Sequence, residues 1–169
     1  MAKKYHEEVN EYLADRFDVL RLKEYIPPHV TLKTPFETDC IEAVEKILER
    51  LAVIHQTIPV FFEGFGHFDK SVIFLKIPVL DDIALLVHGL QNALKEIPWI
   101  KFSKFDLNHT PHATIAYKGI EPVFDVLWNF VANEEPFIAT VLNNISILQE
   151  QDNRWIVYKK YALAPLVQR

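Results

Sequence analysis

Apolar side chains recur at helical spacing in four stretches of the chain, and this spacing predicts four helices. In residues 6–18 the side chains of Val9, Leu13 and Phe17 lie four positions apart and therefore share one helix face. Three further helices are expected: one capped by Thr38 or Asp39 and running to about residue 52, one capped by Asp81 or Asp82 and running to about residue 96, and one over residues 121–132.

Runs rich in β-branched and aromatic residues separate these stretches and predict strands. Residues 57–65 and 71–77 are expected to pair as a hairpin around Gly64, Gly66 and Asp69. Residues 136–148 and 154–163 are expected to form two more strands, joined by a turn at residues 151–153. Pro98 ends the preceding helix, and residues 98–110 are expected to be a loop.

Two further expected strands, at residues 28–34 and 111–118, nearly repeat one another. The first contains Pro28-His29-Val30-Thr31-Leu32, and the second contains Pro111-His112-Ala113-Thr114-Ile115. Side chains alternate between the two faces of a strand, so the histidine and threonine of each segment point the same way. If the two strands lie side by side, two imidazoles and two hydroxyls converge.

The order of elements after each repeated segment is also the same, namely a helix, a strand, a turn and a strand. In this order residues 71–76 correspond to residues 155–160. We therefore predict a bilobal α+β fold whose two lobes, each a mainly antiparallel sheet flanked by helices, are related by a pseudo-twofold axis. Residues 1–169 are expected to form a single domain with the active site in the central cleft, and its second half begins at about residue 111.

Composition and charge limit the class of protein. The chain is 50% hydrophobic but has no apolar run of the length, about 18 residues, that a membrane span needs, so we expect a packed core and no membrane span. The net charge of −5 argues against a protein that coats long duplex nucleic acid, because such proteins are basic. The lack of an apolar leader near Met1 and the single cysteine, Cys40, favour a cytoplasmic protein.

The four polar side chains of the repeated segments suit proton transfer around a phosphate. One of His29 and His112, when neutral, can accept a proton from water, while the other, when protonated, gives one to the leaving oxygen. The hydroxyls of Thr31 and Thr114 can donate to non-bridging phosphate oxygens. This chemistry needs no metal ion and no other cofactor, and the sequence leaves open which histidine is the acid.

Two lysines follow the repeated segments on the same expected strand faces. Lys33 comes two residues after Thr31, and Lys118 comes four residues after Thr114. We expect both lysines to add positive charge near the phosphate.

The two H-x-T-x motifs, His29-Val30-Thr31-Leu32 and His112-Ala113-Thr114-Ile115, resemble the signature of the 2H phosphoesterase superfamily and, within it, the bacterial 2′-5′ RNA ligase-like group. Residues 26–28, 64–66 and 155–158 are similar to the family as well. The resemblance implies a metal-independent phosphodiesterase that hydrolyses 2′,3′-cyclic phosphate ends or 2′-5′ linkages of RNA or nucleotides, or joins 2′-5′ linkages in reverse. It also implies the two histidines and two threonines as the catalytic set.

Two features depart from the family pattern. Members usually begin with a hydrophobic strand before the first helix, whereas here only Tyr5 precedes the helical stretch. Many members carry an arginine after the second motif, where this chain has Tyr117 and Lys118, and neither can form a bidentate guanidinium contact. We expect Tyr117 and Lys118 to contact the substrate, and Phe65, Phe68 or Tyr117 to stack on a base.

The other histidines are expected to lie outside the site. His6, His55 and His88 are assigned to helices or their ends, at the surface or partly packed, and His67 is assigned to a turn. His109 is assigned to a loop near the mouth of the cleft and not to a zinc site, because no cysteine or carboxylate is fixed nearby.

Two alternatives are left open by the sequence. The same cleft can hold a nucleotide or an RNA end without turning it over, or the histidines can be packing residues of a structural protein. The expected partner is a nucleotide or a short RNA end bearing a cyclic or 2′-5′ phosphate, and we expect a monomer.

Overall fold

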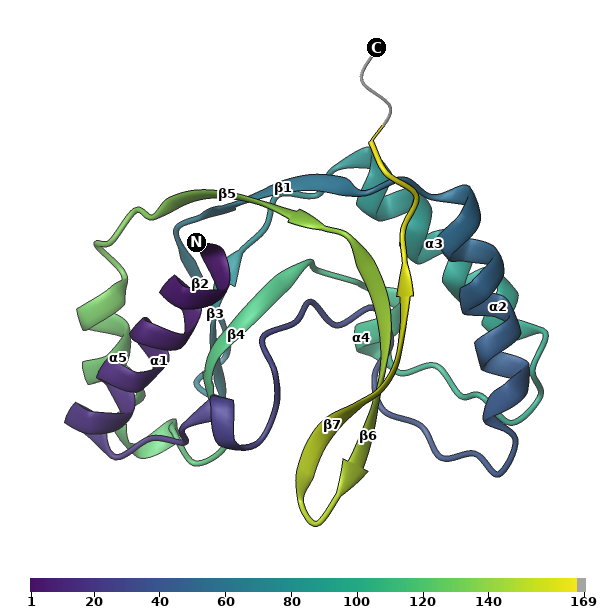
Figure 1. Ribbon diagram of the computed structural model, residues 1–169. Coiled ribbons are helices and arrows are strands. Elements are labelled where there is room, and N and C mark those ends of the chain that lie inside the picture. The colour runs from purple at the N-terminus through teal and green to yellow at the C-terminus, as the bar shows by residue number, and fades with distance from the viewer. Residues whose placement is uncertain (167–169) are drawn as a thin grey trace.

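The computed structural model describes residues 1–166 as an α+β fold of small antiparallel sheets and covering helices (Figure 1). The mixed class predicted from the sequence is confirmed. The helices are α1 (Ala2–Phe17), α2 (Ile41–Ile54), α3 (Asp81–Lys95), α4 (Lys104–Leu107) and α5 (Phe124–Val131), with 3-10 turns η1 (Leu22–Glu24) and η2 (Glu121–Val123). The strands are β1 (Ile58–Glu63), β2 (Phe65–Phe68), β3 (Val72–Lys76), β4 (His112–Tyr117), β5 (Phe137–Leu142), β6 (Asn144–Gln151) and β7 (Arg154–Ala162).

Within residues 1–166 the strands form three sheets, and all strand pairs in these sheets are antiparallel. β2, β3 and β4 form a three-stranded sheet in that order, β1 pairs with β5, and β6 pairs with β7. In Figure 1, α1 and α5 lie on the side of the three-stranded sheet, α2 and α3 lie on the other side of the molecule, and β1 and β5 run between the two groups. α2 packs against α3 and against the β6–β7 hairpin.

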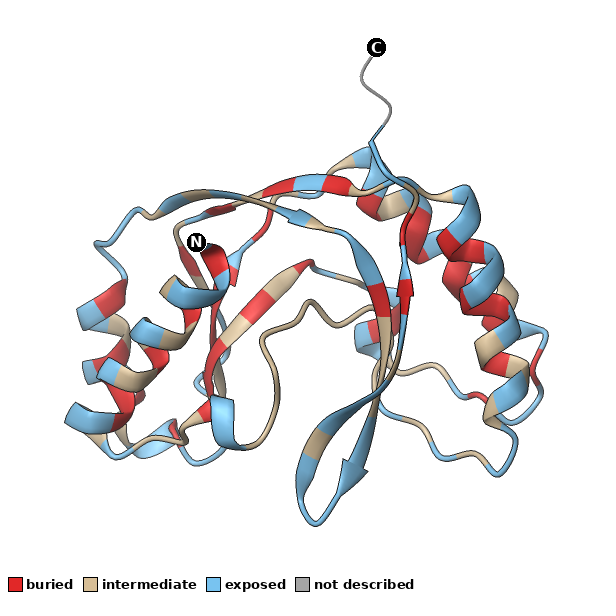
Figure 2. Ribbon diagram, viewed as in Figure 1, coloured by how far each residue is buried: buried red, intermediate tan, exposed pale blue. Residues whose placement is uncertain are grey.

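The apolar helix faces predicted from the sequence are buried in the hydrophobic core. Leu13 of α1, Leu90 of α3 and Leu127 of α5 are buried, as is Ile115 of β4. Figure 2 shows that the buried positions of these elements lie on their inward faces. Each such aliphatic side chain contributes roughly 1.5–3 kcal/mol when it is fully removed from water. Within residues 1–166, no helix is both long and apolar enough to cross a lipid bilayer.

Residues 104–107 form the helix α4, where the sequence predicted only a loop. Ser103 caps this helix by accepting a hydrogen bond from the backbone N–H of Asp106, and the Asp106 carboxylate accepts one from the backbone N–H of Ser103. This reciprocal pair is the capping box, whose S-x-x-D signature is present in the sequence.

The predicted hairpin between residues 57–65 and 71–77 is wrong in its first strand. β3 pairs with β2, whereas β1 pairs with β5 from the other half of the chain. The predicted first strand is divided into β1 and β2 at Gly64. The φ of Gly64, 66°, lies in the left-handed region that glycine adopts at little cost. β1 and β5 hold equivalent positions in the predicted repeat, and antiparallel pairing of equivalent strands is the arrangement that a twofold axis produces.

The prediction of a strand over residues 28–34 is also wrong, because this segment has an irregular backbone. Three prolines explain the difference: Pro27, Pro28 and Pro35 have no N–H to donate to a ladder, so a regular strand pair cannot form across the segment. One backbone bond beside it, from Trp155 N–H to the Tyr25 carbonyl at 2.6 Å, links it to β7. The segment runs between β4 and the β6–β7 hairpin (Figure 1).

Candidate active site

The two motif histidines share one local anchoring contact. The Nδ1 atom of His29 lies 2.8 Å from the carbonyl oxygen of Pro27, and the Nδ1 atom of His112 lies 2.6 Å from that of Thr110. A carbonyl only accepts, so in each ring Nδ1–H donates and a neutral ring carries its lone pair on Nε2. A proline stands between each histidine and its partner residue, which extends the chain and makes this contact possible. The same tautomer is therefore set in both motifs.

The second motif has the alternation predicted from its sequence. Along β4, His112 and Thr114 are partly exposed, whereas Ala113 and Ile115 are buried. The imidazole and the hydroxyl therefore share one accessible face of the strand. In the first motif, His29 and Thr31 are also partly exposed, although their backbone belongs to no strand.

A direct hydrogen bond links the two motif regions. His109, three residues before His112, places its Nε2 atom 2.8 Å from the carbonyl oxygen of Thr31. The two motif histidines are also close enough for His29 to lower the pKa of His112. The four residues predicted from the sequence thus lie in one region of the molecule.

A buried carboxylate, Asp106 at 2% exposure, fixes the loop that carries the first motif. It accepts bonds from the Thr34 N–H and the Thr34 hydroxyl, both at 2.7 Å, and from the Lys33 ammonium at 3.1 Å. Burial alone raises the pKa of Asp106, but these bonds and the one from Ser103 N–H outweigh it and lower the pKa to about 2. A depressed carboxyl pKa contributes stability above the ordinary 3.8 that is lost as the pH falls through about 2.

Lys33 therefore has a different role from the one expected. Its side chain is only 7% exposed, and its ammonium is bonded to Asp106 and to both oxygens of Thr34. We leave Lys33 out of the set that contacts a phosphate and regard it as a support of the motif loop.

Burial lowers the pKa of both motif histidines below the usual 6.5. In His29 and His112 the hydrogen bond to a backbone carbonyl opposes this effect in part, because it favours the protonated ring. In His112, the neighbouring His109 and His29 lower the pKa further. The site therefore favours two neutral imidazoles near neutral pH.

Two aromatic rings lie beside His112. The ring of His112 lies 5.0 Å from that of Phe68 and 4.8 Å from that of Phe74, measured between centroids. Lys76 is the register partner of His112 across β3 and β4, so the two side chains leave the same face of the sheet. The lysine is exposed, and no ion pair engages it within residues 1–166. Lys76 was not among the residues predicted for the site, although its alternation with Phe74 in residues 71–77 places both on one face of a strand.

Tyr117 and Lys118 lie at the far end of β4 from His112. Tyr117 pairs with Val72, whereas His112 pairs with Lys76 at the opposite end of the ladder, roughly 16 Å away at the usual rise per residue. The Lys118 ammonium lies over the Tyr117 ring at 5.3 Å. A phosphate in contact with His112 is thus distant from both side chains, and their expected substrate contact would have to involve another part of a longer ligand.

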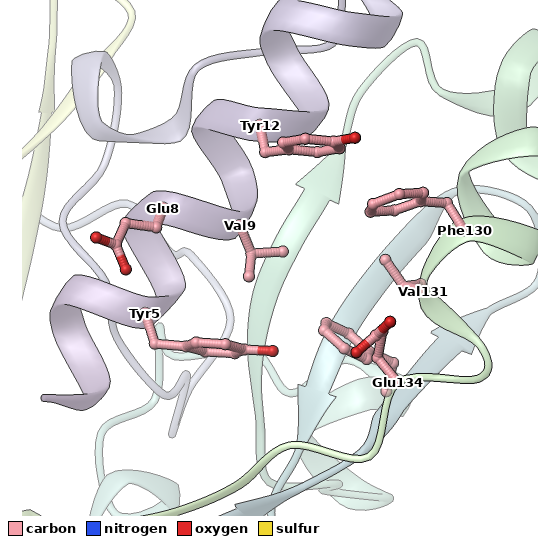
Figure 3. A pocket seen from close by; sticks show the side chains of 8 residues that line it. Tyr5, Glu8, Val9, Tyr12, Phe130, Val131 and Glu134 are labelled. Atoms are coloured by element: carbon pink, nitrogen blue, oxygen red, sulfur yellow. The ribbon is translucent and has the colours of Figure 1, made fainter.

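Phe65 also lies apart from the motif residues. It is 7% exposed and lines a pocket of about 260 Å³ between α1 and α5, together with Tyr5, Glu8, Val9, Tyr12, Phe130, Val131 and Glu134 (Figure 3). Phe68, on the same strand, lies beside the His112 ring, as Phe74 of β3 does. Of the two β2 rings predicted as candidates for base stacking, Phe68 lies beside a motif histidine and Phe65 does not.

Two histidines assigned to peripheral positions belong to this region. His6 is buried, at 4% exposure, and its Nε2 atom lies 2.6 Å from the carbonyl oxygen of Thr114. His109 bonds to Thr31, as described above. Their positions depend on how α1 and the loop before β4 pack, so no local sequence pattern indicates them. Among residues 1–166, no three histidine, cysteine or carboxylate side chains are grouped so that they would hold a metal ion.

Gly66 is required by the packing of Phe74 against His112. A Cβ atom at position 66 would lie 2.6 Å from Cε2 and 2.8 Å from Cζ of Phe74. We expect Gly66→Ala to displace the Phe74 ring, lower the free energy of unfolding by about 1–3 kcal/mol and reduce turnover with it. Urea unfolding and an activity assay check this. Gly89→Ala, where the new Cβ makes only ordinary contacts, is the control, and equal behaviour of the two variants would contradict the argument.

The fold and the paired motifs place the chain among proteins of known structure. The crystal structure of TT0787 from Thermus thermophilus superposes with a TM-score of 0.67 at 15% identity, covering 98% of this chain and 94% of that chain. The crystal structure of Escherichia coli LigT complexed with 3′-AMP gives a TM-score of 0.62 at 15% identity, covering 95% and 92%. At this level of identity the likeness shows the fold.

Sequence comparisons identify the family. The model of the 2′-5′ RNA ligase superfamily matches residues 7–154, and the chain belongs to this superfamily. "Putative phosphoesterase GK0864" of Geobacillus kaustophilus is 30% identical over 142 residues, covering 80% of this chain and 78% of that protein. A "Putative phosphoesterase" of Bacillus pumilus is 29% identical over 144 residues, covering 82% and 80%.

Proposed function

We propose that the protein is a metal-independent phosphodiesterase that hydrolyses 2′,3′-cyclic phosphate ends or 2′-5′ linkages of nucleotides or short RNA. The observation that carries this proposal is the matched anchoring of His29 and His112. Each ring donates from Nδ1 to a carbonyl two residues earlier and leaves Nε2 for the substrate. A site that only bound phosphate would need donors, not two rings with matched proton-accepting atoms.

In the proposed reaction, water attacks phosphorus in line with the leaving ribose oxygen. One neutral imidazole accepts the water proton at Nε2, and the other imidazole, protonated, delivers its Nε2 proton to the leaving oxygen. The P–O bond to water forms as the P–O bond to the ribose breaks, so the product is a phosphate monoester. Which of His29 and His112 is the acid depends on the orientation of the substrate, so we assign neither to one role.

The threonine hydroxyls and Lys76 are proposed to stabilise the charge on the non-bridging oxygens. No hydrogen bond engages the hydroxyl of Thr31 or Thr114 within residues 1–166, so both are available as donors. Lys76, the register partner of His112 on the neighbouring strand, is proposed to supply a positive charge to the same site. This assignment replaces Lys33 and Lys118 as the proposed source of positive charge.

The crystal complex of LigT with 3′-AMP supports a nucleotide as the ligand class, because LigT shares this fold and 3′-AMP is a ribonucleotide with a phosphate at the 3′ position. A nucleoside 2′,3′-cyclic phosphate has its phosphate at the same ribose edge. We therefore propose this group as the reacting part of the substrate and Phe68 as the ring that meets its base.

A substrate screen tests the proposal. The protein is incubated in EDTA with the four nucleoside 2′,3′-cyclic phosphates and with 2′-5′ and 3′-5′ linked dinucleotides, and the products are separated by chromatography. We expect a phosphate monoester from the cyclic or 2′-5′ substrates and none from the 3′-5′ dinucleotide. Binding without product after long incubation would favour the alternative, a non-catalytic module for nucleotides or RNA ends.

Activity is expected to peak on the acid side of neutrality. The acid must be protonated in the free enzyme, and burial lowers the pKa of both histidines below 6.5, so the protonated fraction falls as the pH rises through that lowered pKa. The base must be neutral, which limits the rate at still lower pH. A pH profile of kcat/KM measures both limbs, which belong to the histidine pair. A rate that keeps rising up to pH ~9 would contradict this acid–base assignment.

A further inference from the structure

A second pair of histidines, His6 and His109, holds the backbone of the two motif threonines. The Nε2 atom of His6 is 2.6 Å from the Thr114 carbonyl oxygen, and that of His109 is 2.8 Å from the Thr31 carbonyl oxygen. Since carbonyls only accept, Nε2–H is the donor in both rings. Each motif threonine is therefore held by one imidazole from outside its own motif.

Each of these imidazoles also lies near the catalytic histidine of the other motif. His6 bonds to Thr114 of the second motif, and His29 of the first motif lowers the pKa of His6. His109 bonds to Thr31 of the first motif and lowers the pKa of His112 of the second. Each of the two side chains thus connects the threonine of one motif with the histidine of the other.

The hydrogen bonds from His6 and His109 go to backbone carbonyls that no neighbouring strand engages within the described part of the chain. Thr31 belongs to no strand, so no ladder fixes its peptide groups. Among the described residues 1–166, only β3 pairs with β4 in its sheet, and α1 lies along β4 instead of another strand. From α1, His6 donates to Thr114 and Asn10 donates from Nδ2 to the Ile115 carbonyl at 2.9 Å.

The burial of His6 indicates more than packing. The residue is 4% exposed, and its Nδ1 atom has no hydrogen-bond partner within residues 1–166. An unpartnered buried nitrogen is unfavourable, and a leucine would fill the space without it. What a leucine lacks is the donor that the Thr114 carbonyl requires.

We propose that His6 and His109 are positioning residues that fix the hydroxyls of Thr114 and Thr31 for phosphate. The proposal rests on the proposed function. Threonine is stiff about χ1, so the placement of its backbone determines where its hydroxyl points. Loss of either imidazole therefore displaces a hydroxyl that stabilises the transition state, and a shift of about 1 Å costs up to ~10²-fold in rate.

The test compares leucine and glutamine at both positions. Glutamine carries an amide N–H that can reach a carbonyl as Nε2–H does, whereas leucine cannot donate. We expect His6→Leu and His109→Leu to lower kcat for a nucleoside 2′,3′-cyclic phosphate by ~10- to 10²-fold with little change in KM, and the glutamine variants to recover most of it. Matched variants of the exposed His88 on α3, His88→Leu and His88→Gln, should leave kcat unchanged.

A second readout does not depend on turnover. Ring-proton NMR follows the titration of His112, whose pKa is lowered by the neighbouring His109 and His29 and whose register partner on β3 is Lys76. His109→Gln removes one neighbouring imidazole and should raise the apparent pKa of His112, whereas His88→Gln should not. Wild-type kcat in both leucine variants would overturn the proposal, whether or not the titration of His112 shifts.

Failure of the proposed function is recognised separately. If the wild-type protein turns over no cyclic phosphate or 2′-5′ linkage, inorganic phosphate replaces the substrate, and the shift of the His112 signal reports its binding. Weaker phosphate binding in the leucine variants with recovery in the glutamine variants supports the positioning role. Equal binding in all variants overturns it.

Discussion

His112→Ala and His29→Ala are each expected to reduce turnover of a nucleoside 2′,3′-cyclic phosphate by about 10²- to 10⁴-fold, which is the usual contribution of a positioned general acid or base. Each variant removes the Nε2 atom that accepts or delivers the proton. Both residues are partly exposed, and each ring makes a backbone hydrogen bond, to Thr110 or Pro27. The loss is therefore expected in kcat, with a near-normal unfolding transition.

The matched control for these variants is His88→Ala, which removes an exposed imidazole from α3. Steady-state kinetics and thermal unfolding of the three variants separate lost chemistry from lost structure. If either motif variant turned over substrate within a few-fold of the wild-type rate, its histidine would be neither the acid nor the base.

Asp106→Asn is expected to destabilise the protein by about 3–5 kcal/mol, the usual cost of breaking a buried ion pair. The change leaves the Lys33 ammonium buried without its carboxylate, and it turns an amide N–H toward donors of Thr34 and Ser103. The first-motif loop loses its main anchor, so turnover should fall as well. Urea unfolding at neutral pH, with turnover measured on the folded protein, checks both effects.

Asp125→Asn is the control for this variant. Asp125 pairs with Lys70 at the surface, where both side chains are more than half exposed, and such pairs contribute only about 0–1 kcal/mol. Similar unfolding midpoints for Asp106→Asn and Asp125→Asn would show that the buried network does not hold the loop.

The mixed fold and the four motif residues were within reach of the sequence because both depend on local patterns. Helical spacing located α1, α2, α3 and α5, and period-two alternation described β4 correctly. The repeated H-x-T segments were visible without knowledge of their partners. The capping box of α4 is equally local, and its S-x-x-D signature was a usable signal that the loop prediction missed.

The errors arose where long-range contacts decide the structure. Residues 28–34 have a strand-like composition, but prolines on both sides withhold the donors that a ladder needs. Lys33 follows the motif at strand spacing, yet Asp106, from another part of the chain, binds its ammonium. Lys76 becomes the partner of His112 only through the register of β3 with β4, and His6 reaches Thr114 only because α1 lies along β4.

The central claim is that His29 and His112 form one acid–base pair at one phosphate, and a double-mutant comparison tests it most directly. We would measure kcat for a nucleoside 2′,3′-cyclic phosphate in His29→Ala, in His112→Ala and in the variant that carries both changes. Residues that act as a unit are non-additive, so the double variant is expected to be no slower than the slower single variant within a few-fold. Losses that multiply, so that the double variant falls by the product of the two single effects, would contradict the account.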